Sequence, residues 1–519
     1  MSLLTTTLLN PRNFRLVIAA LATTCILSVL LFFPPGSQTP TTALDIGQAS
    51  TASADLHPSA VNSTSTTVVD LTPAETALLT DLTQYFTDHP IQKPYKEKYG
   101  ELGRRLRIVR GWLTLSQTSG NPTTRALYAD AVEQVARTQF PFLTHPDHPS
   151  TEPIARLRAS FEPQSAGIVI PTSDTTVRYA AHLIGALRSV LHSTLPIQVV
   201  YAGDGDLSAA HRDLLATLAG PAGPALEFLD IRTVFDDAPL QLRAGGWAIK
   251  AFAALGARFE TVILADADAV FLQRPEVLLG HAAVRQRGAL LFHDRLLWPH
   301  AFAGRHQWWH DQIRRPSGTL NASRVWTEEY AEEGDSGLVV LNKGRADVLV
   351  ALLHVGWQNS YEVREETTYK ITYGDKESWW LGLELAGAEY AFSPHYGGIV
   401  GWEREAEVDA LGGVVDGQSG GVCSFVIAHV DAKDRLLWYN GSLLKNKGQP
   451  GMENEYQVPD KWMIDADWIK GARKQDQSCM VNGVVRDLTD EEKGILERSI
   501  ELAKSLDGLV QSVQSVQAV

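Results

Sequence analysis

Short apolar runs that alternate with stretches of helical spacing fill the middle of the chain. Residues 167–170 and 197–201 are two such runs, and each is followed by apolar positions at helical spacing, over 177–192 and 207–218. A further strand is expected near 226–231. Apolar runs interleaved with amphipathic helices predict β–α units. The repetition of these units predicts an α/β fold with a doubly wound, mostly parallel sheet.

The stretch Thr261–Leu272 is an apolar run that closes on two carboxylates, Asp266 and Asp268. A helix expected at 247–255, with Lys250 within it, leads directly into this strand. Sheets of this kind bind ligands at the carboxyl ends of their strands, where both aspartates would emerge. Two hard oxygen donors at this spacing suit Mg²⁺ or Mn²⁺, and such a metal commonly holds a diphosphate. An Asp-rich turn after a core strand is the alternative interpretation.

The same alternation continues towards the C-terminus. Strands are expected at 288–292, 335–342 and 424–430, a helix at 347–357, and the N-terminus of another helix within 374–382. His429 is near the end of the last strand, where a lone histidine is more often a core residue than a ligand. Residues 298–326 form a loop-rich region dense in tryptophan and arginine. This region predicts either a sugar-stacking platform or aromatic packing beneath a long insertion.

The N-terminus has the pattern of a membrane anchor. Residues 1–15 carry Arg12 and Arg15 as their only charged side chains, and residues 16–33 are apolar apart from three hydroxyl side chains. About 18 apolar residues just span a bilayer core, and the flanking arginines predict a cytoplasmic tail with the rest of the chain lumenal. A cleaved signal peptide is the alternative. Sequons at Asn62, Asn321 and Asn440 fit a lumenal location.

Three further segments flank the strand–helix units. Residues 34–72 are rich in Ser, Thr, Pro and Ala and predict a disordered stalk. Residues 73–160 predict a helical stem region, whose arginines at 104, 105, 107 and 110 favour a solvated helix face over a phosphate site. Residues 165–447 then form the catalytic domain, and 448–519 a C-terminal extension that ends in a helix.

Charge and cysteine content narrow the choice of partner and compartment. The net charge of -14 argues against a nucleic-acid partner. Of the three cysteines, one lies in the apolar N-terminal run, leaving Cys423 and Cys479 in the remainder. These two permit one disulfide if that remainder lies in an oxidising compartment, without requiring it.

Five motifs, taken in order behind an anchor and stalk, resemble the fungal α-1,3-mannosyltransferases of glycosyltransferase family 71, which are type II Golgi membrane proteins. These motifs are Gly246-Trp-Ala-Ile-Lys250, Leu264-Ala-Asp-Ala-Asp268, Asp335-Ser-Gly337, Gly374-Asp-Lys-Glu377 with Trp379 and Trp380, and His429 followed by Leu437-Trp-Tyr-Asn-Gly441. The resemblance covers about residues 165–445.

The resemblance implies a GT-A glycosyltransferase that moves mannose from GDP-mannose to a mannose-containing glycan or glycoprotein with retention of anomeric configuration. It also implies a Mn²⁺ site formed by Asp266, Asp268 and His429. Lys250, Asp266 and Trp379 are expected to contact the donor, with the Trp379 ring able to stack on a sugar.

Asp335, Asp375 and Glu377 are the expected catalytic carboxylates, although Asp335 replaces an expected glutamate. The residues do not decide between a carboxylate nucleophile and front-side attack shielded by the departing phosphate.

Three other functions share parts of this pattern. A haloacid-dehalogenase-type phosphatase also has an apolar strand followed by Asp-x-Asp, but on the first strand of its domain, whereas about a hundred residues of β–α units precede Asp266. A GT-A enzyme that uses a UDP-sugar has the same metal motif. A catalytically silent GT-A scaffold subunit is the third alternative, against which the retained aspartates, Lys250 and His429 argue.

Overall fold

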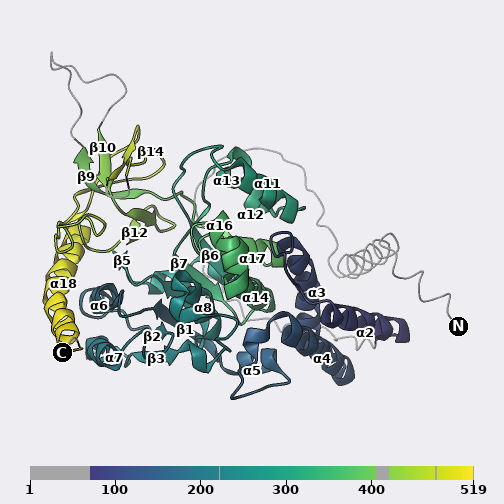
Figure 1. The fold of residues 1–519 in the computed structure, drawn as a ribbon. Helices are drawn as coiled ribbons and strands as arrows, with labels where there is room; N and C mark the ends of the chain where they lie inside the picture. The colour runs from purple at the N-terminus through teal and green to yellow at the C-terminus, as the bar shows by residue number, and fades with distance from the viewer. Residues whose placement is uncertain (1–70, 221–222, 405–419, 474–475, 518–519) are drawn as a thin grey trace, which may run out of the picture. The chain divides into compact units, whose positions relative to one another are not determined.

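A seven-stranded sheet lies at the centre of the computed structural model, with strand order β3-β2-β1-β4-β7-β6-β8 (Figure 1). The structure describes residues 71–220, 223–404, 420–473 and 476–517. The strands are β1 (Glu162–Pro171), β2 (Ile197–Tyr201), β3 (Glu227–Asp230), β4 (Phe259–Ala265), β6 (Ala289–His293), β7 (Gly334–Asn342) and β8 (Ala391–Phe392). Strands β1 to β4 pair in parallel, whereas β7 is antiparallel to both β4 and β6. The predicted mostly parallel α/β sheet is confirmed, and β7 runs antiparallel to its two neighbours.

Helices cover both faces of this sheet, which explains the unbroken apolar runs. Ile168 and Ile263 pack in one core with helices α6 (Val177–Gly185) and α18 (Asp490–Gln517). Successive side chains on a strand point to opposite faces. Helices α8 (Ile249–Gly256), α14 (Ala346–Asn359) and α17 (Ser378–Ala386) pack against β4, β7 and one another on the other face. Strands β2, β6 and β7 and the second halves of β1 and β4 therefore bury both of their faces, whereas the edge strands β3 and β8 are only partly buried.

Residues 298–326 are mainly helical, which corrects the expectation of a loop-rich region. They contain α11 (Ala303–Gln312), α12 (Gly318–Asn321) and α13 (Arg324–Glu328). Ser317 and Ser323 begin the two short helices, because each hydroxyl accepts a hydrogen bond from a backbone N–H of the first turn. Trp308 and Trp309 of α11 are buried. Aromatic packing beneath the insertion therefore accounts for these two tryptophans.

The residues before β1 fold as α2 (Pro73–Asp88), α3 (Tyr99–Thr118), α4 (Pro122–Gln139) and α5 (Pro153–Ala159). Helix α3 packs against α14 and α17. Arg107 donates hydrogen bonds of 2.8 and 2.7 Å to the carbonyls of Leu385 and Glu384, and Arg110 donates to that of Gly387. These arginines therefore satisfy the free carbonyls at the C-terminus of α17, which corrects the prediction of a solvated face.

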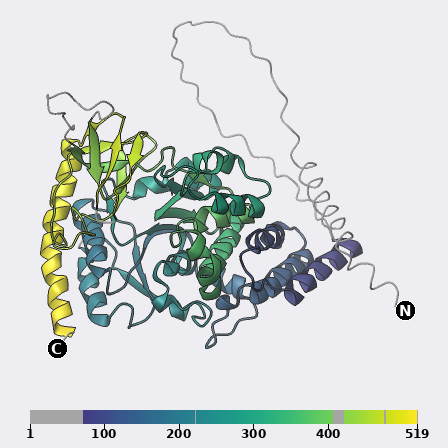
Figure 2. The ribbon, with the colours of Figure 1, turned by 45° about the horizontal axis from the view of Figure 1, so that its top comes forward.

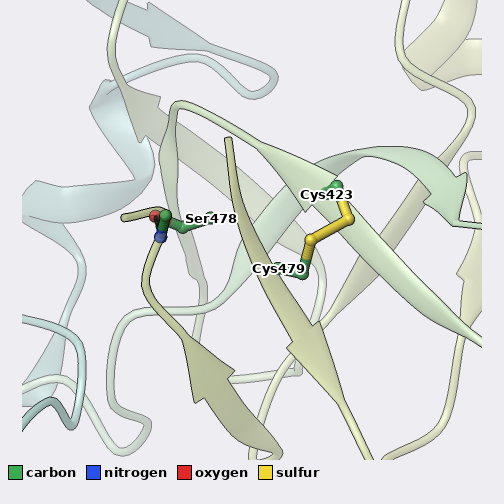
Figure 3. Close-up of a disulfide and its surroundings, with 4 residues drawn as sticks. Cys423, Ser478 and Cys479 are labelled. Carbon is green, nitrogen blue, oxygen red and sulfur yellow. Dashed lines mark hydrogen bonds between the residues drawn. A yellow bond between two sulfur atoms is a disulfide. The ribbon is translucent and has the colours of Figure 1, made fainter. Parts of the chain in front are cut away.

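A second, antiparallel sheet follows the central one, with order β14-β15-β10-β9-β13-β16. Its strands are β9 (Ile399–Arg404), β10 (Gly421–Ser424), β13 (Lys461–Met463), β14 (Asp467–Ile469), β15 (Ser478–Val481) and β16 (Arg486–Asp487). Cys423 of β10 lies opposite Cys479 of β15, and the two form a disulfide (Figure 3). A three-stranded sheet, β11 (Ile427–Val430), β12 (Leu436–Asn440) and β5 (Ala269–Phe271), adjoins the end of β4.

The C-terminal helix α18 lies alongside α6 (Figures 1 and 2). Asp507 of α18 accepts hydrogen bonds from Arg178 at 2.7 and 2.6 Å and from Tyr456 at 2.6 Å, and lies 2.8 Å from the ring of His182. Burial raises the pKa of Asp507, but the hydrogen bonds from His182, Arg178 and Tyr456 lower it below its ordinary value. Asp507 of the C-terminal helix therefore joins α6 to the segment before β13.

Residues 1–70, which contain the predicted tail, the anchor at 16–33 and nearly all of the stalk, lie outside the described residues. Among the helices that the structure does describe, none combines the length and the apolar character needed to cross a membrane.

Candidate active site

Asp266 and Asp268 lie at the carboxyl edge of the central sheet, as the sequence predicts. The backbone N–H of Asp266 donates to the carbonyl of Gly337 in β7, at 2.8 Å, and its own carbonyl accepts from Ala269, at 3.0 Å. The chain then turns into β5, and the carbonyl of Asp268 accepts a 2.8 Å hydrogen bond from Ser442. The two side chains remain 24% and 19% exposed. Both carboxylates are therefore within reach of a ligand at this edge.

Lys250 reaches the same edge because α8 leads into β4 and runs antiparallel to it. Its Nζ lies 2.9 Å from Asp266 Oδ1 and 3.1 Å from Asp375 Oδ2. It also donates to the carbonyl and the hydroxyl of Ser336, at 2.8 and 2.9 Å. Burial lowers the pKa of Lys250, but the carboxylates of Asp266 and Asp375 raise it above its ordinary value. A charged lysine thus joins β4, β7 and the segment before α17.

Lys447 is a second cation at this edge, and the sequence analysis did not identify it. Its Nζ contacts Asp268 Oδ2. Burial lowers the pKa of Lys447, but the charge and the hydrogen bond of Asp268 raise it above its ordinary value. Burial raises the pKa of Asp266 to about 6; Lys250 opposes this rise, and the charges of Asp268 and Asp375 add to it. Each aspartate is therefore neutralised by its own lysine.

The two aspartates form a partial ligand set for a divalent cation. Such a cation is commonly held by one or two protein carboxylates, with phosphate and water oxygens as its other ligands. Asp266 and Asp268 fit a cation bound in this way, since both are oxygen donors and both are partly exposed. In the part of the chain that the structure describes, no three His, Cys, Asp or Glu side chains are arranged to hold a metal.

His429 is not brought to the other two predicted metal ligands. Strand β11 pairs with β12, which stacks the His429 ring on Trp438 with centroids 4.4 Å apart. The His429 Nε2 lies 3.0 Å from Asp335 Oδ2, and both side chains are buried. His429 is paired with Asp335 in this structure, and its role as a third metal ligand stays a prediction.

Asp335 lies in β7, beside Asp266, but it is shielded by its partners. Its Oδ1 accepts hydrogen bonds of 2.9 Å from both Gly337 N–H and the amide of Asn440. Burial raises the pKa of Asp335, but the hydrogen bond and charge of His429, with the charge of Lys376, lower it below its ordinary value. The side chain is 1% exposed. In this structure Asp335 positions His429 and Asn440, and its catalytic role stays a prediction.

Asp375 and Glu377 are also buried and fully paired. Asp375 Oδ2 accepts a 2.8 Å hydrogen bond from Trp379 Nε1, in addition to its contact with Lys250. Glu377 accepts from the backbone N–H of Glu333, at 3.1 Å, and from Trp380 Nε1, at 2.6 Å. The two carboxylates are 1% and 0% exposed. Both carboxylates are engaged by neighbouring groups in this structure, and their catalytic role stays a prediction.

Trp379 is 2% exposed, so neither face of its ring is open to a sugar in this structure. Its indole N–H is directed at Asp375. The stacking of Trp379 on the donor sugar stays a prediction, and in this structure the ring holds the carboxylate that contacts Lys250.

Comparison with known proteins identifies the family of the chain. Residues 165–431, just over half of the chain, match the family model described as "Mannosyltransferase putative". The chain belongs to this family. The matched segment runs from β1 to the end of β11 and contains Lys250, both edge aspartates and the Asp335–His429 pair. The resemblance to the fungal α-1,3-mannosyltransferases, and membership of a glycosyltransferase family, are thereby confirmed.

Named relatives cover the same region. "Alpha-1,3-mannosyltransferase MNT3" of Saccharomyces cerevisiae is 30% identical over 321 residues, which is 56% of this chain and 49% of that protein. "Alpha-1,3-mannosyltransferase MNT2" of the same yeast is 26% identical over 306 residues, 54% of this chain and 52% of that protein. "Putative alpha-1,3-mannosyltransferase MNN14" of Candida albicans is 27% identical over 300 residues, 53% and 42%. The chain spans about half the length of these relatives.

Solved structures give weaker likenesses. The galactosyltransferase LgtC in complex with donor and acceptor sugar analogs is 16% identical at a TM-score of 0.28, over 44% of this chain and 73% of that one. Mouse xyloside xylosyltransferase 1 is 10% identical at a TM-score of 0.29, over 44% and 82%. These likenesses are too weak to support a conclusion about the site.

Proposed function

We propose that the chain is a metal-dependent GT-A mannosyltransferase that forms α-1,3 linkages. It transfers mannose from GDP-mannose to a mannose-containing glycan of a glycoprotein, with retention of configuration. The proposal rests on the contacts of Lys250 with Asp266 and Asp375 at the carboxyl edge of the sheet, in a chain that belongs to a mannosyltransferase family. The names of the yeast relatives support the linkage.

The edge is suited to a diphosphate. Asp266 and Asp268 would hold Mn²⁺ together with diphosphate oxygens, and the ion would neutralise charge on the leaving group. Lys250 and Lys447 lie against these two carboxylates and bring further positive charge to the same place. Electrostatic stabilisation of the departing GDP is therefore the main contribution that these residues make.

The chemistry follows from the pairing of the other carboxylates. The acceptor hydroxyl oxygen forms a bond to C1 of mannose, while the bond between C1 and the β-phosphate oxygen breaks and its electron pair leaves with GDP. Asp335, Asp375 and Glu377 are buried and hydrogen-bonded, so we do not assign a nucleophile among them. The hydroxyl proton passes to an oxygen of the departing diphosphate, on the face where the acceptor attacks. This step is the front-side attack that retains the anomeric configuration.

We further propose a lumenal Golgi location behind the anchor at residues 16–33. The Cys423–Cys479 disulfide supports an oxidising compartment. The exposed Asn321, the acceptor residue of a sequon, also supports it. The sequon at Asn440 does not, because the Asn440 amide donates to Asp335 inside the site.

The test uses the full-length chain in detergent, with Mn²⁺ and α-mannobiose as acceptor. GDP-mannose, UDP-glucose, UDP-galactose and UDP-N-acetylglucosamine are supplied in turn, and released nucleotide and product are measured. We expect consumption of GDP-mannose alone, loss of activity in Asp268→Ala, and full activity in Asp311→Asn, an exposed aspartate of α11.

Consumption of a UDP-sugar would contradict the donor assignment and leave the enzyme class intact. If no donor is consumed and GDP with Mn²⁺ does not raise the melting temperature, the chain is a scaffold subunit, because a ligand of the folded state stabilises it.

A further inference from the structure

Two of the thirteen tryptophans are largely exposed in the described structure, Trp247 at 47% and Trp298 at 49%. Trp247 lies in the turn Gly246–Ala248, about one helical turn before Lys250. Since Lys250 contacts Asp266 at the carboxyl edge of the sheet, Trp247 lies just beyond that edge. Trp298 follows β6 and is not joined to Lys250 or Asp266 by any contact that the structure describes.

Trp247 is held in place although half of it faces solvent. Its ring lies 5.3 Å from that of Tyr373, at an interplanar angle of 49°, and 6.2 Å from that of Tyr369, edge-on. The backbone of Gly374, with a φ of +64°, lies directly against the indole, since a Cβ added there would be 2.7 Å from the ring. Only glycine allows both this φ and this approach. Among the described residues, by contrast, the exposed Phe302 is the only aromatic ring near Trp298, at 6.5 Å.

Tyr373 completes the exposed aromatic surface on the side of Asp375. It is 59% exposed and lies two residues before Asp375, which pairs with Lys250. Trp247 and Tyr373 therefore flank the Lys250–Asp375 pair from two different elements. Two neighbouring rings match a single ring-sized ligand in size and are far smaller than a protein interface.

We propose that Trp247 and Tyr373 form a stacking platform for a hexopyranose ring of the acceptor glycan. A pyranose ring has a face of C–H groups that packs against the negatively polarised face of an aromatic ring. A rigid tryptophan or tyrosine binds such a face at low entropic cost. This inference rests on the proposed mannosyltransferase function and adds the acceptor subsite to it.

The position favours the acceptor over the nucleotide. In a doubly wound sheet the nucleoside is expected over the carboxyl ends of β1, β2 and β3. These strands lie on one side of β4, and β7 lies on the other. Tyr373 and Gly374 precede α17, which packs against β7. The platform therefore lies on the β7 side of this edge, away from the place expected for the nucleoside.

The test compares Trp247→Ala and Tyr373→Ala with Trp298→Ala, a matched control of similar exposure. Steady-state transfer from GDP-mannose to α-mannobiose is measured with the full-length enzyme. We expect the acceptor KM to rise roughly five- to tenfold in Trp247→Ala, with kcat and the GDP-mannose KM within about twofold of wild type. Trp247→Phe, which keeps a ring, should recover most of the loss. Trp298→Ala should match wild type.

Two results would overturn the platform. One is a rise in the GDP-mannose KM, with an unchanged acceptor KM, in Trp247→Ala. The other is a loss of acceptor affinity in Trp298→Ala and not in Trp247→Ala. Thermal unfolding of each variant separates a binding defect from misfolding, and the milder Trp247→Phe and Tyr373→Ala variants keep the test open if Trp247→Ala does not fold.

A binding measurement separates this inference from the proposed function. Saturation-transfer NMR with α-mannobiose, Mn²⁺ and GDP needs no turnover. If wild type binds the disaccharide and Trp247→Ala does not, the platform stands even where no donor is consumed. If wild type transfers mannose and Trp247→Ala binds and uses the acceptor as well as wild type, the platform falls while the enzyme assignment remains.

Discussion

Replacement of Lys250 by methionine should destabilise the fold, because it leaves the buried Asp375 and the partly exposed Asp266 without their cation. The lysine is 3% exposed and lies 2.9 Å from Asp266 and 3.1 Å from Asp375. Removal of one partner from a buried ion pair costs about 3–5 kcal/mol. Methionine fills the volume of the lysine chain, so the lost charge accounts for most of this cost.

This loss of unfolding free energy corresponds to a modest fall in melting temperature. The compact unit spans Thr66–Val519, and an unfolding entropy of about 2.1 cal/mol/K per residue gives it a total of about 1 kcal/mol/K. We therefore expect the melting temperature of Lys250→Met to fall by about 3–5 °C, measured by calorimetry without metal or nucleotide.

A second substitution tests whether charge is the cause. Asp375→Asn removes one of the two stranded charges and keeps an oxygen to accept from Trp379, so it should restore about half of the loss in the Lys250→Met background. The control is Lys343→Met, since Lys343 is also fully buried but donates to the backbone carbonyls of Ala254, at 3.0 Å, and Leu255, at 2.8 Å. Asp375→Asn should not rescue it. Equal effects of Asp375→Asn in the wild-type and Lys250→Met backgrounds would refute the coupling.

Three further predictions follow from buried or paired groups. Burial, and then the charge of Glu332, raise the pKa of Glu377 from 4.5 to about 8. The folded state thus keeps a proton that the unfolded state loses, and stability should fall between pH 4.5 and 8 by up to about 1.4 kcal/mol per pH unit. Glu377→Gln should flatten that slope in melting curves, and an unchanged slope would contradict it. The double Cys423→Ser, Cys479→Ser variant should lose about 2–4 kcal/mol, given a separation of 56 residues, and dithiothreitol should lower the melting temperature of wild type only. Arg107→Ala should cost about 1–2 kcal/mol in chemical denaturation, because two carbonyls at the end of α17 lose their donors; no loss would show that water replaces the guanidinium.

The half of the sheet from β1 to β4 could be predicted because local pattern decides it. The runs at 167–170 and 197–201 are buried on both faces, and Gln198 is the one strongly polar residue in them. Strand β2 has the bounds 197–201 that were predicted for it. The position of Lys250 at the edge follows from the same logic, since a helix that leads into β4 must begin where β4 ends. This position brings Lys250 into contact with Asp266.

The partners of the other predicted residues could not be found in this way. Lys447 meets Asp268 across 179 residues, and nothing in its local sequence distinguishes it from a surface lysine. The antiparallel direction of β7 is decided by pairing with β4 and β6 and leaves no local mark. The two short helices at 318–321 and 324–328 did carry signals, the serines at their N-caps, which the density of tryptophan and arginine obscured.

Residue type alone does not show how the carboxylates near the motif are paired. Asp335, Asp375 and Glu377 are buried with partners on both oxygens. Asp266 and Asp268 keep 24% and 19% of their side chains exposed, and each contacts a lysine. A carboxylate with exposed surface can reach a ligand without giving up the partners that hold a buried carboxylate in place. Exposure at the carboxyl edge of the sheet therefore distinguishes the two predicted metal-binding aspartates from the other three carboxylates.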